Sequence, residues 1–297
     1  MYHPAGVYPA MPTPFMRNGD LDETGLRNLV SYYETTGVNG LLALGTIGEF
    51  AMMSGEERRR AAEVIVGAAD RLEIIANAGC ASTRETVEMA GHMKDLGVDA
   101  VIVVEPYFYH PAPKGMARHY LEIAEAVDMP VMAYNIPQFS GNRLMPDIMD
   151  SFAEDDRIVG LKDSGGDPVV LMEFINRAPE GFSVMVGADP LVSYGICMGA
   201  KGMMTGSSSI APDACVDMYR AASGADMEKT FALQGMLNDI IAAMNVGTFP
   251  AAAKYMLNKK GLPGGYVRPP LEELSDAERL IVDDYVKDSL AMRKVII

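Results

Sequence analysis

Residues 131–164, VMAYNIPQFSGNRLMPDIMDSFAEDDRIVGLKDS, contain the pattern that decides the fold. The runs Val131–Tyr134 and Ile158–Leu161 are continuously apolar, which is typical of strands covered on both faces in a parallel sheet. The stretch between them is long enough for a helical crossover. This segment therefore predicts one βαβ unit.

The same pattern repeats along the chain at intervals of about 25 residues, close to the length of a βαβ unit. The predicted strands are Gly6–Ala10, Gly40–Leu44, Glu73–Ala76, Ala100–Val104, Val131–Tyr134, Ile158–Leu161, Ser183–Val186 and Gly202–Thr205. Helix signals lie between them. Ser54 precedes Glu57 and Ser82 precedes Glu85, both at capping-box spacing. Gly97 is a typical stop for the second of these helices, Ser82–Leu96.

Eight strands alternating with helices fit a closed (β/α)8 TIM barrel, which typically takes about 250 residues. A doubly wound open sheet is the alternative, but no GxGxxG follows the first strand, where a dinucleotide site needs it. After residue 222 the strand signal stops, and three helices are expected over Asp226–Asn245, Phe249–Lys260 and Ser275–Ile296. We therefore expect a barrel over residues 1–222 and a helical extension over 223–297, packed on the outside of the barrel or on a neighbouring subunit.

The chain of 297 residues carries 25 basic and 40 acidic side chains, a net charge of −15. A surface this acidic repels phosphate backbones, so we expect no nucleic-acid partner. A small anionic substrate remains compatible, because a few local donors outweigh distant screened charge. The apolar runs are shorter than the ~20 residues of a membrane helix, and no signal-peptide pattern opens the chain, so no membrane partner is expected.

The cysteines and histidines argue against disulfide and metal sites. Cys80, Cys197 and Cys215 are odd in number and scattered, which favours a reducing compartment. The four histidines show no metal-ligand spacing. We expect a cytoplasmic protein without a bound metal.

Catalytic residues of a (β/α)8 barrel lie at the C-terminal ends of its strands. Lys162 directly follows Ile158–Leu161, so its amine is expected in the barrel mouth, where lost hydration favours the neutral form that attacks a carbonyl. Pairing with Asp163 or Glu49 is the purely structural alternative, and strand position does not separate the two. Tyr134 ends the neighbouring strand, where a phenol either shuttles protons or simply packs.

The loop Gly45–Glu49 (GTIGE) follows the second strand. Its two glycines allow a tight turn whose backbone N–H groups suit a carboxylate, and Thr46 adds a hydroxyl. Glycine-rich turns also join many strands to helices without binding anything. Alone, this pattern is therefore not specific.

Four motifs in one order carry a family resemblance: GTIGE at Gly45–Glu49, YNIP at Tyr134–Pro137, GLKDS at Gly160–Ser164 and RPPL at Arg268–Leu271. With them the chain resembles the dihydrodipicolinate synthase/N-acetylneuraminate lyase family of lysine-dependent aldolases over essentially its whole length. The resemblance implies a (β/α)8 barrel with C-terminal helices, assembled as a homotetramer. It also implies a Schiff base between the strand-six lysine and pyruvate or another 2-oxo acid, with no further cofactor.

The same resemblance implies roles for individual residues. Lys162 would be the Schiff-base lysine, Tyr134 the proton shuttle and Thr46 a proton relay. The backbone of residues 46–48 would hold the carboxylate of the 2-oxo acid. The substrate-binding candidates are Ile47, Gly48, Gly187, Asp189, Met204 and Ser207.

The chain departs from the family pattern at three positions. Ile47 stands where a second hydroxyl residue is usual. Phe108, flanked by Tyr107 and Tyr109, stands where a neighbouring subunit usually lends a tyrosine to the proton relay. Phe139 replaces the arginine with which the synthases grip the second substrate, and losing a bidentate carboxylate clamp is not a conservative change.

We therefore expect a Schiff-base lyase or aldolase that forms or cleaves a C–C bond between pyruvate and an aldehyde. Its substrate would be a sugar-derived 2-oxo acid such as a 2-keto-3-deoxy acid or N-acetylneuraminate. The alternatives are dihydrodipicolinate synthase activity and a sugar-acid dehydratase that uses the same lysine. A sugar-acid-binding barrel without catalysis is the alternative of another class, suggested by Ile47 and Phe108.

Overall fold

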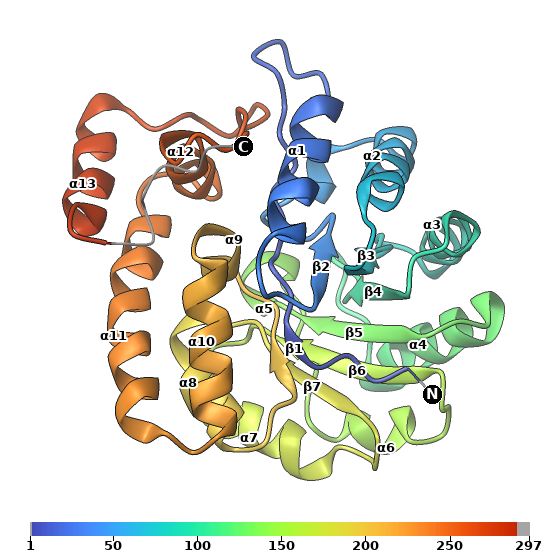
Figure 1. The fold of residues 1–297 in the computed structure, drawn as a ribbon. Coiled ribbons are helices and arrows are strands. Elements are labelled where there is room, and N and C mark those ends of the chain that lie inside the picture. The colour runs from blue at the N-terminus through green and yellow to red at the C-terminus, as the bar shows by residue number, and fades with distance from the viewer. Residues whose placement is uncertain (1, 290–297) are drawn as a thin grey trace.

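The computed structural model describes residues 2–289. Eight parallel strands surround the centre of the molecule and helices cover them on the outside (Figure 1). The strand order is β1-β8-β7-β6-β5-β4-β3-β2, and a parallel bridge between Ala10 and Leu42 brings the two ends of the sheet together. The predicted (β/α)8 barrel is thus confirmed, and the open doubly wound sheet is wrong.

The strands are β1 (Gly6–Val7), β2 (Gly40–Ala43), β3 (Glu73–Asn77), β4 (Ala100–Val104), β5 (Val131–Asn135), β6 (Ile158–Asp163), β7 (Ser183–Val186) and β8 (Gly202–Met203). β1, β2 and β8 are shorter than predicted. Pro9 has no N–H to donate and interrupts the regular ladder, although the N–H of Ala10 still reaches the carbonyl of Thr205 at 3.0 Å. β6 is longer than predicted and includes Lys162.

The helices are α1 (Glu23–Glu34), α2 (Gly55–Ala68), α3 (Thr83–Leu96), α4 (Pro113–Val127), α5 (Pro137–Ser140), α6 (Ile148–Phe152), α7 (Pro168–Arg177), α8 (Val192–Cys197), α9 (Ser207–Ile210), α10 (Pro212–Ser223), α11 (Met227–Met244), α12 (Ala251–Lys259) and α13 (Asp276–Val286). Ser54 and Glu57 form the predicted capping box, and Gly97 ends α3 in the left-handed region at φ 85°. Within residues 2–289, no helix combines the length and the apolar character needed to cross a bilayer.

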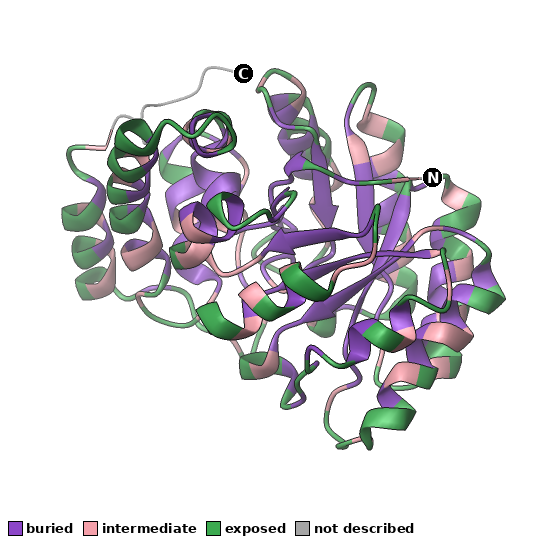
Figure 2. Ribbon diagram, turned by 90° about the horizontal axis from the view of Figure 1, so that it is seen from below, coloured by how far each residue is buried: buried purple, intermediate pink, exposed green. Residues whose placement is uncertain are grey.

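The strands form the buried centre of the molecule. Every residue of β2, β4, β5, β6 and β7 is buried. Figure 2 shows the strands buried throughout, while the helices are buried on one side and exposed on the other. This two-sided cover explains why the strands are continuously apolar in sequence rather than alternating.

The C-terminal helices do more than pack on the outside of the barrel. α11 and α13 stand beside the barrel in Figure 1. However, Ile241, Met244 and Asn245 at the end of α11, and Phe249 just beyond it, line the same cavity as Lys162. These side chains therefore line the barrel mouth, in addition to the packing of α11 against α10 and α8. The third helix, predicted over Ser275–Ile296, is α13 and ends earlier than predicted, at Val286; the predicted part from residue 290 on lies outside the described residues.

A buried ion pair ties α12 to the loop after β2. The side chains of Lys254 and Glu49 form this pair and are only 2% and 1% exposed. The backbone N–H of Arg268 donates to the second carboxylate oxygen of Glu49 at 3.0 Å. The Arg268 side chain in turn binds Glu57 and holds the pKa of that carboxyl at about 2. The C-terminal segment thus anchors the GTIGE loop.

Replacing Lys254 by methionine should lower the free energy of unfolding by about 3–5 kcal/mol, because it leaves the Glu49 carboxylate buried without its partner. Lys259→Met on the same helix removes an ion pair with Asp283 whose side chains are 40% and 36% exposed, and it should cost at most about 1 kcal/mol. Urea unfolding of both variants measures the difference. Equal losses would contradict the anchoring role of the buried pair.

Candidate active site

Lys162 lies in the mouth of the barrel. It pairs with Tyr134 across β5 and β6, and its amine nitrogen lies 4.0 Å from the centroid of the Tyr134 ring. The side chain is almost completely buried, with 3% of the residue exposed. Glu49 pairs with Lys254 instead, and Asp163 accepts a hydrogen bond from Asn135 at 2.6 Å. The structural alternative, in which Lys162 pairs with either carboxylate, is wrong.

A hydroxyl pair stands beside the amine. The Tyr134 hydroxyl and the Thr46 hydroxyl lie 3.1 Å apart, and both side chains line the cavity that contains Lys162. Thr46 comes from the loop after β2 and Tyr134 from β5, so the barrel joins residues 88 positions apart. Two linked hydroxyls in the same cavity as an amine offer a route for moving a proton. The structure therefore brings the three predicted catalytic side chains together.

The cavity has a volume of about 550 Å³. Four of the predicted substrate-binding residues line it: Ile47, Gly187, Asp189 and Met204. Two do not: Gly48 and Ser207 lie outside the lining. Gly187 makes room for the lysine, because a Cβ there would clash with the Ser164 hydroxyl and lie 2.7 Å from Cε of Lys162.

The GTIGE turn offers fewer free donors than the sequence suggested. The N–H of Gly48 donates to the carbonyl of Gly45, and the N–H of Glu49 donates to that of Thr46, both at 3.0 Å. The predicted carboxylate site over residues 46–48 therefore has fewer available N–H donors than predicted. Of residues 46–48, Thr46 and Ile47 are the two whose N–H groups have no acceptor among residues 2–289.

Asp189 lines the cavity, whereas Ser207 lies outside the lining and contacts Asp189. The backbone N–H of Ser207 donates to the Asp189 carboxylate at 2.8 Å. Burial raises the pKa of Asp189, while the Ser207 hydrogen bonds and the positive charge of Lys162 oppose that rise. Asp189 can thus accept a hydroxyl group of a ligand or hold a proton, and Ser207 positions it.

Buried polar side chains hold the backbone around Tyr134 and Lys162. Glu105 accepts the N–H of Ile136 at 2.8 Å, two residues after Tyr134. Asn135 donates to Asp163, which also accepts the N–H of Gly165 at 3.1 Å. Burial raises the pKa of Glu105 to about 7. The sequence marks Glu105 only as a strand-end residue and does not reveal this supporting role.

The three aromatic residues after β4 point in different directions. Tyr107 packs against Phe50 of its own chain, with ring centroids 6.3 Å apart. Phe108 and Tyr109 are 80% and 77% exposed, and Phe108 takes a left-handed backbone conformation with φ 78°. Neither of these two lines the catalytic cavity of this chain.

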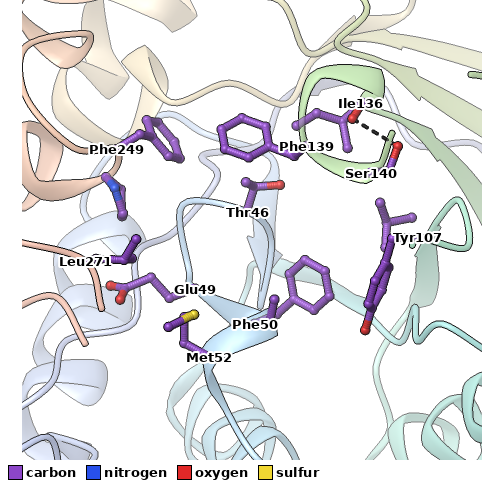
Figure 3. Close-up of a pocket in the computed structure, with 13 residues that line it drawn as sticks. Thr46, Glu49, Phe50, Met52, Tyr107, Ile136, Phe139, Ser140, Phe249 and Leu271 are labelled. Atoms are coloured by element: carbon purple, nitrogen blue, oxygen red, sulfur yellow. Dashed lines mark hydrogen bonds between the residues drawn. The ribbon is translucent and has the colours of Figure 1, made fainter. Parts of the chain in front are cut away.

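A second, smaller chamber of about 210 Å³ adjoins the catalytic cavity. Figure 3 shows its lining, with Thr46, Phe139 and Phe249 along one edge and Phe50 and Tyr107 along another. Thr46, Ile136, Phe139 and Phe249 line both spaces. Sequence reasoning missed Phe249, because no local signal shows which surface a C-terminal segment will cover.

A sequence model of the dihydrodipicolinate synthetase family matches residues 3–289. The chain belongs to this family. Its members are class I aldolases, so the protein is an enzyme of the lyase class, and the resemblance read from its four motifs is confirmed.

Named relatives and solved structures of this family align with nearly the whole of this chain. The 4-hydroxy-tetrahydrodipicolinate synthase of Methanothrix thermoacetophila is 33% identical over 91% of this chain and 92% of that protein. The enzyme of that name from Methanopyrus kandleri is 35% identical over 90% of both. A structure of dihydrodipicolinate synthase from Acinetobacter baumannii, described as complexed with pyruvate, aligns with a TM-score of 0.92 at 32% identity and covers 96% of this chain and 98% of its own.

The raised pKa of Glu105 predicts a specific pH dependence of stability. The native carboxyl keeps its proton up to about pH 7, whereas the unfolded chain releases it near 4.5. The contribution of Glu105 to the free energy of unfolding is therefore largest below pH 4.5. It is lost as the pH rises through 7, by up to about 3 kcal/mol. Glu105→Gln should remove this loss.

Urea unfolding of Glu105→Gln at pH 5 and pH 8 measures the effect, with Glu180→Gln, at an exposed carboxyl, as the control. At pH 8, Glu105→Gln should raise the free energy of unfolding above that of the wild type, whereas Glu180→Gln should leave it unchanged. Parallel pH profiles for the two variants would contradict the assignment.

Proposed function

We propose that this enzyme forms a Schiff base between Lys162 and pyruvate and uses it to form or cleave a C–C bond between pyruvate and an aldehyde. One observation carries the proposal: the buried amine of Lys162 lies against the Tyr134 ring, and the Tyr134 hydroxyl is linked to that of Thr46. The pyruvate complex described for the Acinetobacter baumannii synthase supports it.

The proposed first half-reaction uses the three side chains in turn. The neutral amine of Lys162 attacks the C2 carbonyl of pyruvate and gives a carbinolamine. The Tyr134–Thr46 hydroxyl pair passes a proton to the former carbonyl oxygen, which leaves as water. The N–H groups of Thr46 and Ile47 would hold the carboxylate during this step.

The proposed second half-reaction makes the new bond. Loss of a proton from C3 converts the iminium into an enamine, and its C3 attacks the aldehyde carbon while the aldehyde oxygen takes up a proton. Water then hydrolyses the imine and frees Lys162. The reverse sequence cleaves the bond. The protonated imine itself accepts the electron pair, so this chemistry calls for no metal or organic cofactor.

The identity of the aldehyde separates the finer candidates. The names of the relatives favour the synthase alternative over a sugar-derived substrate. The product in those names is a dicarboxylate, so its aldehyde brings a carboxylate of its own. In this chain Phe139 stands where the resemblance to the synthases implies an arginine, and among residues 2–289 Lys162 is the one basic side chain in the cavity lining. Support for the sugar-acid lyase and dehydratase is at family level only, and the non-catalytic barrel has none, because the relatives are named as enzymes.

We further propose that the enzyme is a cytoplasmic homotetramer. Exposed Phe108 and Tyr109 beside the barrel mouth support contact with a second copy, since large exposed aromatics mark interaction surfaces. The free thiols of Cys80, Cys197 and Cys215 suit a reducing compartment. Light scattering of the purified protein should give four times the chain mass, and a monomer mass would contradict the assembly.

Borohydride reduction in the presence of pyruvate tests the proposed function. Intact-mass analysis should show one reduced pyruvate per chain, and peptide mapping should place it on Lys162. Lys162→Ala should lose the adduct and lower turnover by more than about 10³-fold, whereas Lys201→Ala, at an exposed lysine, should keep both. Wild-type protein without an adduct, or with one on another lysine, would contradict the proposal.

The proton route is tested separately with Tyr134→Phe. Removing the hydroxyl while keeping the ring should slow Schiff-base formation by about 10²–10⁴-fold, the usual size of general acid–base catalysis. Stopped-flow absorbance of the imine measures this rate. An unchanged rate would show that Tyr134 only packs against the lysine.

A further inference from the structure

Glu105 stands at the end of β4, beside the strand that carries Tyr134. The residue is completely buried. Its backbone N–H donates to the carbonyl of Tyr134 at 3.2 Å, and its carboxyl oxygen Oε1 accepts the N–H of Ile136 at 2.8 Å. Glu105 therefore holds both peptide groups that follow Tyr134.

The second carboxyl oxygen of Glu105 has no partner. This oxygen, Oε2, is buried and makes no hydrogen bond with any of residues 2–289. The same holds for Oδ2 of Asp163, which lies on the other side of β5. A buried carboxylate oxygen without a donor makes the ionised form costly. The site therefore favours a neutral Glu105 as long as the strand ends keep these positions.

Three polar side chains face Glu105: Asp163 of β6, Tyr120 of α4 and Ser140 of α5. Burial raises the pKa of Glu105 to about 7, hydrogen bonds from Ile136 and Ser140 oppose the rise, and the charge of Asp163 adds to it. Tyr120 is uncharged, because burial raises its pKa well above the usual value and the charge of Glu105 adds to that rise. None of the three side chains supplies a positive charge that would pair with an ionised Glu105.

The proton route depends on the backbone that Glu105 holds. The Tyr134 hydroxyl lies 3.1 Å from that of Thr46, at the long end of the range for such bonds, which is about 2.5–3.0 Å. A small outward shift of the Tyr134 backbone therefore breaks this contact. Ionised Glu105 favours such a shift, because its unpartnered oxygen gains a donor only if water or another polar group reaches it.

We propose that Glu105 is a positioning residue for Tyr134: while it keeps its proton it holds the Tyr134 hydroxyl against that of Thr46, and its ionisation releases the strand end and slows Schiff-base formation. This inference rests on the proposed Schiff-base function. Glu105 does not line the catalytic cavity, so it acts through Tyr134 and not on the substrate.

Stopped-flow absorbance of imine formation with pyruvate tests the inference at pH 6 and pH 8. Glu105→Gln keeps an oxygen for the Ile136 N–H but cannot ionise. The rate of this variant divided by the wild-type rate should be at least about fivefold larger at pH 8 than at pH 6, since misplacing a catalytic group by about 1 Å can cost about 10²-fold. Titration of the Lys162 amine affects both proteins and cancels in the ratio.

Glu180→Gln is the matched control, because it changes an exposed carboxyl in the same way. Its rate relative to the wild type should be the same at pH 6 and pH 8. An equally constant ratio for Glu105→Gln would overturn the inference.

A second background separates positioning from a direct effect of the Glu105 charge on the Lys162 amine. Tyr134→Phe has no hydroxyl to position, so adding Glu105→Gln to it should change the rate by the same factor at both pH values. Borohydride trapping over time measures these slower rates. A pH-dependent factor that persists without the Tyr134 hydroxyl would overturn the positioning role.

Amide hydrogen exchange of the wild-type enzyme tests the structural step without any substitution. After correction for intrinsic exchange, peptides covering residues 131–140 should lose protection between pH 6 and pH 8, because ionisation of Glu105 loosens this segment. Equal protection at both pH values would contradict the release of the strand end, and this result counts even if Glu105→Gln does not fold.

Borohydride trapping of pyruvate on the wild type at both pH values keeps the two proposals apart. An adduct on Lys162 together with a constant rate ratio for Glu105→Gln would overturn the role of Glu105 and leave the Schiff-base function standing. Wild-type protein that traps no pyruvate at either pH would overturn both.

Discussion

The active site depends on a one-residue shift in the pairing of β5 and β6. Val131 pairs with Ile158, but Met132 pairs with Gly160, so Val159 is an extra residue in the ladder. Only after this shift does Tyr134 stand opposite Lys162. In an unshifted ladder Tyr134 would face Leu161, because successive side chains point to opposite sides of a strand. Irregular pairing of this kind is common beside active sites, where it re-aims a side chain.

The rest of the structure holds this pair in place from both sides. Glu105 accepts a hydrogen bond from the backbone N–H of Ile136. Asn135 donates a hydrogen bond to Asp163, the residue after the lysine. The loop that contains Thr46 is held by the buried ion pair between Glu49 and Lys254. The C-terminal helices therefore serve the site twice, since they anchor this loop and also supply part of the cavity wall.

The fold follows from local pattern. Continuous apolar runs revealed the strands, and the strand ends made Lys162, Tyr134 and Thr46 candidates, but their proposed catalytic roles came from the family resemblance of the four motifs. Their meeting needs only the barrel topology, which the repeated strand–helix pattern already implies. The ends of β1 and β8 could not be predicted from the apolar runs, because Pro9 interrupts the ladder while hydrogen bonding continues on either side of it.

Features that depend on the path of the chain in space were not predictable in this way. Gly48 uses its N–H inside its own turn, and Ser207 stands behind Asp189 rather than in the cavity. Phe249 reaches Phe139 from 110 residues further along the chain, and no periodicity in either segment encodes that encounter. The contact between these two aromatic segments is therefore visible only in the structure.

Exchange of the pyruvate methyl protons tests the central claim most directly, because it reports the Lys162 enamine without any acceptor. Pyruvate would be mixed with the enzyme in D₂O and its methyl signal followed by proton NMR. The methyl signal should decay with wild-type enzyme and persist with Lys162→Ala. A methyl signal that persists with the wild-type enzyme, or decays equally with the variant, would contradict the claim.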